Sequence, residues 1–417
     1  MKTFLNTLQK GFHKTFWIAN TLELFERLAF YGSKAVLTVY LAEKVGLGPQ
    51  MAGTLAGAFS GLLYSLPILA GTLVDRYGFR RTLTACFAFF TIGYFLIGLA
   101  GLEFGQYIIA VTGRTPYIIG VLLLTAVGGS LIKPCIVGTV ANTSSDDARS
   151  LGYSIYYTLV NVGGAIGPIL ALQVRSNLGI EYVLIMSSLT SLLLVIGTLL
   201  FFEEPPGTVE ARGGRSMRQV LKDMVLVFAN ARFMLFLVIF SGFYIMFWQI
   251  FYSFPFYVLE ILHFEQFELL ETVDAWTIII LTVPAAALVK KWKPITAMSL
   301  GFAIASASWL LIPLSPSVAT TIVTIALFAA GESILAPRFY EYVASLAPKE
   351  QVGTFMGFAF LPVAIGSFAA GPLAGWLVAN FVRHPQNVNT MWYLLSGIGF
   401  ASTLAMVVYN AAVPAER

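Results

Sequence analysis

Long apolar stretches recur along almost the entire chain, and each is long enough to cross a lipid bilayer as a helix. A transmembrane helix needs about 20 consecutive apolar residues. Only 11% of the 417 residues are charged, whereas soluble domains carry about 25%. No segment alternates in polarity over about ten residues, as the strands of a membrane barrel do. We therefore predict an all-α membrane protein with twelve transmembrane helices, at 15–42, 50–73, 81–101, 115–141, 150–174, 180–202, 233–259, 269–289, 294–314, 317–346, 351–380 and 389–411.

Positive charge is distributed unevenly between the two ends of these stretches, which predicts their orientation. Loops on the cytoplasmic side of a membrane are enriched in Lys and Arg. If both termini are cytoplasmic, 17 of the 25 Lys and Arg residues lie on that side, four lie inside the stretches, and only Lys44, Arg114, Arg175 and Arg383 lie outside. We predict this orientation, in the inner (plasma) membrane of a bacterium. The net charge of +4 gives no indication of a nucleic-acid partner.

One long polar stretch, residues 203–232, divides the predicted spans into six and six. We predict a first bundle at 1–202, a cytoplasmic linker at 203–232 whose second part is a short amphipathic surface helix, and a second bundle at 233–417. The halves also resemble each other. From the proline of G-G-S-L-I-K-P in the fourth span to the Gly-Pro pair of the next span is 33 residues, and from that of A-G-E-S-I-L-A-P in the tenth span it is 34. Two such repeats place a substrate site at their interface, near the middle of the membrane.

The first predicted span carries charged side chains in its interior. Glu23, Glu26 and Arg27 lie near its middle, and at 100° per residue they share one helix face with Tyr31 and Lys34. A charge near the bilayer centre costs about 2.5–3.5 kcal/mol, so we expect this face to line a polar pathway through the membrane. The alternative is a buried ion pair with only a structural role, which would not require two acids and several bases.

Ionisable residues of later spans indicate further parts of such a pathway. Lys133 precedes a proline in the fourth span, where it either faces the pathway or extends toward the membrane surface. Glu332 lies near the middle of the tenth span, and an acid at that depth indicates a functional site. Arg338 and Glu341, an i,i+3 pair further along that span, are candidate specificity or gate residues. Asp274, early in the eighth span, is another, with a position among the lipid headgroups as the alternative.

These charges can couple a proton to a substrate. Burial favours the neutral form of a carboxyl and a nearby cation favours its charged form, so small rearrangements can change its protonation near neutral pH. Glu23 and Arg27 are i,i+4 partners and can pair within the helix. A proton arriving on Glu23 or Glu26 would free Arg27 or Lys133 to bind an anion. We predict that these four residues carry proton coupling.

The loop after the second span reads G-T-L-V-D-R-Y-G-F-R-R, from Gly71 to Arg81. It resembles the signature that the major facilitator superfamily carries between spans 2 and 3. The resemblance implies two pseudo-symmetric six-helix bundles, the major facilitator fold. The corresponding loop of the second half, V-K-K-W-K-P, lacks the Asp and the Gly. Acids and bases at a helix end can lock neighbouring helices in one state, and we expect this role for Gly71, Asp75, Arg76, Gly78, Arg80 and Arg81.

Within that superfamily, motifs of several spans resemble those of the proton-dependent oligopeptide transporters. The run E-L-F-E-R-L-A-F-Y-G-S-K begins at Glu23, and L-Y-S-L-P, L-I-K-P, Y-Y-T-L-V-N-V-G and G-E-S-I-L-A-P follow in spans 2, 4, 5 and 10. The resemblance implies a proton-driven symporter of small peptides, in which the first-span charges and the span-4 lysine carry proton coupling. Basic residues and tyrosines of the first half would hold the peptide carboxylate, the span-5 asparagine its backbone, and the span-10 glutamate its amino group. The substrate-binding residues carried over are Tyr31, Lys34, Tyr64, Asn161 and Glu332.

The span-7 tryptophan, Trp248, is a further candidate for the substrate pocket, although aromatic residues of a span more often pack against neighbouring helices. The sequence also departs from the family. Lys34 stands where the family usually has arginine, which removes bidentate recognition of a carboxylate. Span 7 has no acid at its middle, and span 10 adds Arg338 and Glu341. These departures leave proton coupling in place and put the peptide specificity in question.

Two alternatives to a peptide symporter therefore stand. The first is a proton-coupled transporter of another small organic cargo, or a drug/proton antiporter. The second is a membrane enzyme or receptor, for which we find no catalytic motif, so we predict no enzymatic activity. We expect a monomer whose partners are the lipid bilayer and a di- or tripeptide or other small molecule. The proton is the only coupling ion expected, without a cofactor or a metal site.

Overall fold

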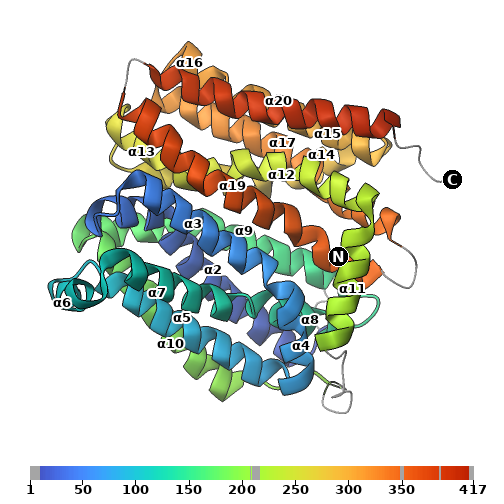
Figure 1. The fold of residues 1–417 in the computed structure, drawn as a ribbon. Helices are drawn as coiled ribbons and strands as arrows, with labels where there is room; N and C mark the ends of the chain where they lie inside the picture. The colour runs from blue at the N-terminus through green and yellow to red at the C-terminus, as the bar shows by residue number, and fades with distance from the viewer. Residues whose placement is uncertain (1–9, 207, 209–216, 348–351, 385–386, 413–417) are drawn as a thin grey trace. The chain divides into compact units, whose positions relative to one another are not determined.

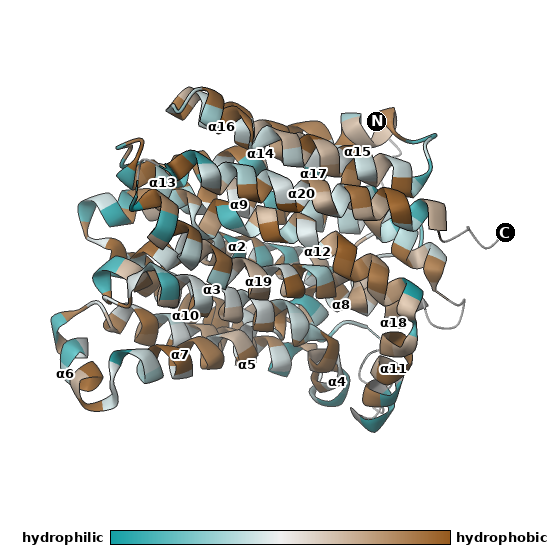
Figure 2. Cartoon of the chain, turned by 45° about the horizontal axis from the view of Figure 1, so that its top comes forward, coloured by the Kyte–Doolittle hydropathy of each residue, from teal (hydrophilic) through white to brown (hydrophobic). Residues whose placement is uncertain are grey.

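A computed structural model describes residues 10–206, 208, 217–347, 352–384 and 387–412. This part of the chain is helical, with one isolated antiparallel bridge between Phe12 and Ser144. Within it, ten helices are long and apolar enough to cross a membrane, and there are eleven candidate spans if the two helices on either side of Leu66 are counted as one. Hydrophobic residues recur along every long helix, interspersed with hydrophilic ones (Figure 2). The prediction of an all-α membrane fold is confirmed.

The predicted first span is helix α2, Lys14–Val39, which continues as the π-helical turn η1, Tyr40–Lys44. Its 26 residues are enough to cross a membrane. Its charged side chains set it apart from the apolar helices of the described residues. The count of twelve spans therefore stays a prediction, with α2 as the helix on which it depends.

Contacts between residues divide the chain into two compact units. Unit 1 consists of Met1–Lys34 and Ser65–Leu221, and unit 2 of Ala35–Tyr64 and Lys222–Arg417. The bundle boundaries that the polar linker predicts, at residues 202 and 232, stay predictions.

Parts of two predictions lie outside the described residues. Residues 207 and 209–216 belong to the predicted linker, and Lys2, Arg212, Arg215, Lys349 and Arg417 belong to the positive residues that predict the orientation. The second part of the linker is described, and it forms the helix α11, Met217–Ala229, where the sequence predicts one.

Unit 1 is built around α5, Phe79–Leu99, which packs against α7 and α10 (Figure 1). A second close approach joins α2 to α9. A side-chain carbon at Gly163 of α9 would lie 2.4 Å from Cβ of Arg27, which leaves no room for any residue larger than glycine. This glycine fixes how near α9 stands to the charged part of α2. The other helices of unit 1 are α4 (Pro67–Tyr77), α6 (Glu103–Thr112), α7 (Arg114–Gly129), α8 (Ile132–Thr143), α9 (Arg149–Asn177) and α10 (Ile180–Phe201).

In unit 2, the long helices pack against one another in several pairs. The helix α15 lies against α17 and α20, α14 lies against α17, and α12 lies against α19 and α20. Helix α3 reaches α19 through glycines, since a side-chain carbon at Gly57 would lie 2.7 Å from Cα of Gly371. These elements are α3 (Gly48–Ser65), α12 (Ala231–Tyr252), α13 (Phe254–Glu260), α14 (Phe267–Leu288), α15 (Pro294–Ser308), α16 (Leu311–Leu314), α17 (Val318–Leu346), α18 (Val352–Gly357), η3 (Phe358–Phe360), α19 (Leu361–Leu377), η4 (Val378–Val382) and α20 (Val388–Ala412).

Candidate functional site

Helix α2 buries one face, which carries four of its five charged residues, and exposes another. The stretch from Lys14 to Tyr31 contains neither proline nor glycine, which favours an uninterrupted helix. Trp17 and Phe25 are 43% and 48% exposed on one side, as expected of residues that face lipid. Glu23, Glu26, Arg27 and Lys34 are buried, whereas Lys14 at the start of the helix is exposed. The helix therefore holds its polar face inside the protein.

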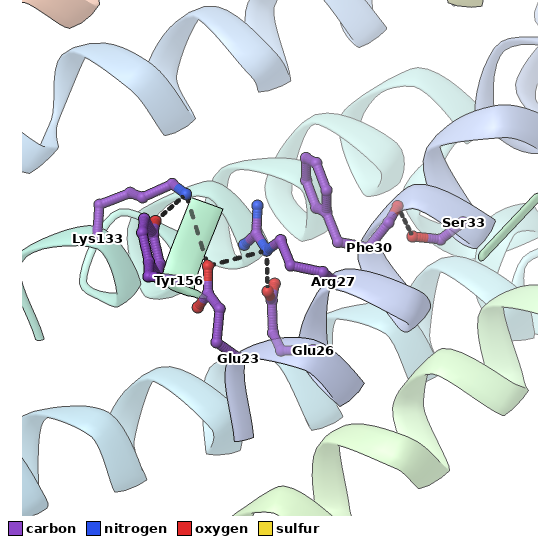
Figure 3. Close-up of polar contacts among 7 residues, drawn as sticks. All are labelled: Glu23, Glu26, Arg27, Phe30, Ser33, Lys133 and Tyr156. Atoms are coloured by element: carbon purple, nitrogen blue, oxygen red, sulfur yellow. Dashed lines mark hydrogen bonds and ion pairs between the residues drawn. The ribbon is translucent and has the colours of Figure 1, made fainter. Parts of the chain in front are cut away.

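Two acids and two bases of unit 1 form one connected network (Figure 3). Nε of Arg27 donates a hydrogen bond to Oε2 of Glu26 and lies 3.4 Å from Oε1 of Glu23. The same Glu23 oxygen lies 3.5 Å from Nζ of Lys133, which donates a 2.6 Å hydrogen bond to the hydroxyl of Tyr156. The network thus joins α2 to α8 and α9, and it brings together the four residues predicted to carry proton coupling.

Tyr156 is a member of this network that we did not assign from the sequence. It stands at the start of the run Y-Y-T-L-V-N-V-G, in which we predicted a role only for the asparagine. A tyrosine within a motif of an otherwise apolar span was the available signal. Its hydroxyl holds the amine of Lys133 beside Glu23.

The network is almost completely withdrawn from solvent. The Glu23 side chain is 0% exposed, those of Glu26 and Arg27 are 2% exposed, and that of Lys133 is 17% exposed. Charges buried to this degree are tolerated when they are paired, and here two carboxylates balance two cations. Among the described residues, no donor forms a hydrogen bond with Oε2 of Glu23 or Oε1 of Glu26. Each carboxyl therefore keeps an oxygen to which a proton can add.

The next turns of α2 continue the polar face with aromatic rings. The guanidinium of Arg27 lies 4.7 Å from the centre of the Phe30 ring, and Nζ of Lys34 lies 5.5 Å from that of Tyr31. Lys34 is 5% exposed. Contacts of this kind between a cation and a ring stabilise by about 0.5–2 kcal/mol. The role of Tyr31 and Lys34 in substrate binding stays a prediction.

Asn161, the predicted contact to a peptide backbone, lies on α9 and is half-buried. Its amide donates a 2.8 Å hydrogen bond to the carbonyl of Tyr157, one turn earlier. An amide has two N–H donors and one oxygen acceptor, so Asn161 can also offer its oxygen and its second N–H to a substrate.

The predicted substrate residues of unit 2 differ in exposure. The rings of Tyr64 and Trp248 meet edge to face with centres 5.9 Å apart. Trp248 is fully buried, donates a 3.1 Å hydrogen bond to the carbonyl of Val363, and stacks on Tyr252. Its indole packs against these neighbours, and its role in a substrate pocket stays a prediction. Glu332 lies in the middle of α17 and is partly buried, and its convergence with the charged cluster of α2 stays a prediction.

Asp274 is one of three buried acids that follow each other along α14. Glu268, Glu271 and Asp274 are 0%, 2% and 6% exposed, and their spacing of three residues places them along one side of the helix. We identified only Asp274 from the sequence, because the other two fall at the predicted edge of the span. The burial of Asp274 argues against a position among lipid headgroups.

Arg338 and Glu341 form the predicted i,i+3 pair, with Nη1 of the arginine 2.5 Å from the carboxylate. Arg338 is 8% exposed and also donates to the carbonyl of Val289, which is the C-cap of α14. A cation at the end of a helix satisfies a carbonyl that has no partner within the helix. The arginine thus fastens the end of α14 to α17.

The loop of the superfamily signature connects α4 to α5. Gly78 has φ of +84°, a conformation that favours glycine, and its amide closes α4 on the carbonyl of Val74. The amides of Phe79 and Arg80 donate to the two carboxylate oxygens of Glu204, at 3.0 and 3.1 Å. Glu204 thereby caps α5 from the start of the linker, a role that we did not assign although the acids of E-E-P-P follow an apolar span directly.

A second charged group of unit 2 links ends of three elements on the side predicted to be outside. The guanidinium of Arg383, after η4, lies 2.6 Å from Oε1 of Glu43 in η1 and 3.4 Å from Oε1 of Glu260 at the end of α13. These side chains are 40%, 55% and 33% exposed. We call Glu43, Glu260 and Arg383 the outer trio. The sequence shows each of them only as a charge near the end of a span.

The helices and the buried charges together define an integral membrane protein with a polar interior. A family model described as Major Facilitator Superfamily matches residues 22–270 and 264–417. The chain belongs to the Major Facilitator Superfamily.

Several proteins with sequences similar to this chain are dipeptide and tripeptide permeases. Dipeptide and tripeptide permease A of Salmonella typhi is 31% identical over 152 residues, which cover 36% of this chain and 28% of the permease. The chain therefore spans less than a third of that relative at this level of identity. Dipeptide and tripeptide permease A of Erwinia pyrifoliae is 23% identical over 449 residues, covering 90% of this chain and 87% of the permease.

Two solved structures share the fold. A POT family transporter in complex with 5-aminolevulinic acid superposes with a TM-score of 0.78 at 17% identity, covering 95% of this chain and 96% of that one. A POT family transporter in complex with a thioalcohol conjugated peptide gives 0.77 at 18% identity, with the same coverage.

Proposed function

We propose that the protein is a proton-coupled symporter of di- and tripeptides or peptide-like molecules, working by alternating access. The observation that carries the proposal is the buried network of Glu23, Glu26, Arg27 and Lys133, with its two acids and two bases. The similarity to peptide permeases supports the choice of cargo. We further propose an inner-membrane protein with both termini in the cytoplasm, active as a monomer.

Proton coupling follows from the charge balance of this network. With both acids ionised and both bases protonated the network is neutral, and one added proton gives it a net positive charge. Protonation of Glu23 would weaken its ion pairs with Arg27 and Lys133 at once, since both cations meet the same oxygen. A substrate carboxylate would restore neutrality. Binding of the proton and of an anionic substrate would then favour each other, and dissociation of the proton on the alkaline side would release the substrate.

Recognition of the substrate would use residues from both halves of the sequence. Lys34 and Tyr31 would bind the carboxylate, Asn161 the backbone, and Glu332 the amino group, while Tyr64 and Trp248 would shape the wall for side chains. Asp274, Arg338 and Glu341 remain candidates for specificity or gating. The loop of Gly71, Asp75, Arg76, Gly78, Arg80 and Arg81 would lock the helices that it connects, with Glu204 as its capping partner.

One observation favours a different transported molecule, coupled to protons by the same residues. Lys34 presents a single ammonium group, whereas an arginine would grip a carboxylate with two parallel hydrogen bonds. A similar fold binds 5-aminolevulinic acid, so a small amino acid-like anion is the alternative cargo, followed by export of drugs against protons. We propose no enzymatic activity, cofactor or metal.

The cargo is tested by uptake in reconstituted vesicles. An inside-alkaline pH gradient is imposed, and labelled di- or tripeptides are compared with small organic anions that carry an amino group. We expect gradient-dependent accumulation of peptides, which a proton ionophore abolishes. Accumulation of the small anions without that of any peptide would reject the peptide cargo and leave proton coupling in place.

The role of Glu332 is tested with substrates that differ only in their amino group. Glu332→Gln removes the negative charge at nearly constant size, so we expect it to weaken binding of peptides with a free amino terminus about tenfold or more. The same peptides with an acetylated amino terminus serve as the control and should be affected little. Equal weakening of both would contradict an amine-binding role.

A further inference from the structure

A cavity of about 750 Å³ lies in unit 2, and none of the site residues discussed above lines it. Its walls come from the first residues of α12 and α15 and from the last residues of α17 and α20. All four helix ends belong to the side that the sequence predicts to be cytoplasmic. Its volume falls within the range of about 300–1,000 Å³ that is typical of small-molecule sites.

The polar part of the wall is positively charged. Arg232 and Lys293 contribute the cations, Asn230 contributes a neutral donor, and no acid is among the described residues that line the cavity. The hydroxyl of Tyr409 donates to the carbonyl of Arg232 at 3.3 Å, and that of Tyr342 donates to Tyr409 at 3.4 Å. These contacts hold the backbone of α12 at Arg232 in place. Such a wall favours an anion with several oxygen acceptors.

The remainder of the wall is apolar, and the surface beside it has the character of a lipid-facing flank. Phe233 and Ile295 line the cavity. Leu235, two residues past Phe233 on α12, is 50% exposed, and Val408, near the end of α20, is 56% exposed. A ligand here would meet cations and hydrocarbon together, which suits an anionic amphiphile better than a fully hydrated anion.

The loop that leads into the cavity adds further lysines and an aromatic side chain. This is V-K-K-W-K-P, the counterpart of the signature loop in the second half. Lys290 and Lys291 are exposed and Trp292 is 44% exposed, directly before Lys293. Tryptophan is enriched at the membrane interface, and lysines at the cytoplasmic surface attract anionic lipids. The contact of Arg338 with the Val289 carbonyl fixes the start of this loop.

We propose that this cavity binds the headgroup of an anionic phospholipid of the cytoplasmic leaflet, with Arg232 and Lys293 on its phosphate. The lipid would anchor the ends of α12, α15, α17 and α20 to one another and to the membrane surface. Inorganic phosphate offers the same anionic oxygens without acyl chains, so it is the competing source of this chemistry. The site is separate from the proposed transport residues and does not depend on the identity of the cargo.

The proposal is tested by native mass spectrometry of the full-length protein in a fixed detergent. Phosphatidylglycerol and phosphatidylcholine with identical acyl chains are titrated, and the apparent Kd of the first bound lipid is measured. The cavity variant Arg232→Gln/Lys293→Gln is compared with Lys44→Gln/Arg114→Gln, which removes the same charge from two exposed positions that do not line the cavity and that the sequence predicts on the outer side. Size-exclusion profiles verify that each variant is folded. If the cavity double variant is unstable, the single variant Lys293→Gln replaces it, because Lys293 is exposed.

We expect the protein to bind phosphatidylglycerol about tenfold or more tightly than phosphatidylcholine, since each cation near the lipid surface adds several-fold in affinity. The cavity variant should lose most of this preference, and the control variant should keep it within about threefold. Equal affinity for both lipids, or an equal loss in both double variants, would overturn the proposal. Displacement of the lipid by millimolar inorganic phosphate would assign the cavity to a soluble anion instead.

Discussion

The buried network of unit 1 and the outer trio of unit 2 use the same kinds of side chain in opposite surroundings. Glu23, Glu26 and Arg27 are at most 2% exposed in their side chains, whereas Arg383 and its two acids are 33–55% exposed. Removing one member of a buried pair leaves a charge that water cannot reach, at a cost of about 3–5 kcal/mol. An exposed pair contributes about 0–1 kcal/mol. The exposure of the side chains, and not their type, therefore decides how much stability is lost when one member of a network is removed.

This difference separates what each network can do. A buried network cannot change its charge without taking up a compensating ion, which is the property that proton coupling requires. The outer trio can open and close at small cost, because water and salt replace its ion pairs. Its position at the ends of η1, α13 and η4 suits a contact that forms and breaks repeatedly.

Arg27→Gln should produce the largest effect on stability. The variant leaves Glu23 and Glu26 with Lys133 as the remaining cation of the network, so we expect the free energy of unfolding to fall by about 3–5 kcal/mol. Titration with a denaturing detergent at mildly alkaline pH measures this change. The double variant Glu26→Gln/Arg27→Gln removes one charge of each sign and should recover most of the loss. A loss below about 1 kcal/mol for Arg27→Gln would show that this network contributes no more to stability than an exposed ion pair does. That result would contradict the comparison.

Gly163→Ala tests whether close helix packing positions the same network. The added carbon would lie 2.4 Å from Cβ of Arg27, so α2 and α9 must shift. We expect a cost of about 1–3 kcal/mol, as for other overpacked sites. Gly120→Ala in α7 is the matched control, because a carbon there meets nothing within 4 Å. Equal stability of the two variants would show that the glycine does not position Arg27.

Arg383→Gln should produce the smallest effect. We expect the free energy of unfolding to change by about 1 kcal/mol or less, and the change should shrink as salt is added, because the ion pairs are screened. A double-mutant cycle with Glu43→Gln isolates the pair from other consequences of each substitution. A coupling energy above about 2 kcal/mol that survives high salt would contradict the comparison with the buried network.

The sequence predicts the helices better than it predicts the partners of their charged residues. Apolar length and helical periodicity place the spans and the face of Glu23, Glu26 and Arg27, because these properties are local. The nearest partner of Arg27 is Glu26, its neighbour in sequence, although i,i+4 spacing favours Glu23. The arginine side chain is long enough to fold back toward that carboxylate, and its position beside α9 depends on a glycine more than 130 residues away in sequence.

Contacts that depend on distant elements could not be predicted from the sequence. The capping of α5 by Glu204 and the contact of Arg338 with the end of α14 each require two helix ends to meet in space. The outer trio joins residues separated by 340 positions in the chain. An ionisable residue near a span end carries the same local signal whether it caps a helix, forms an ion pair or faces lipid headgroups.

The central claim is that protonation of the buried acids drives substrate movement. It is tested most directly by comparing two modes of transport in the same vesicles, for Glu23→Gln and Glu26→Gln separately, using the substrate that the unchanged protein accumulates. Glutamine mimics a permanently protonated acid, so gradient-driven accumulation should be lost while exchange of labelled for unlabelled substrate across the membrane continues. Accumulation that persists in both variants would contradict coupling through this network.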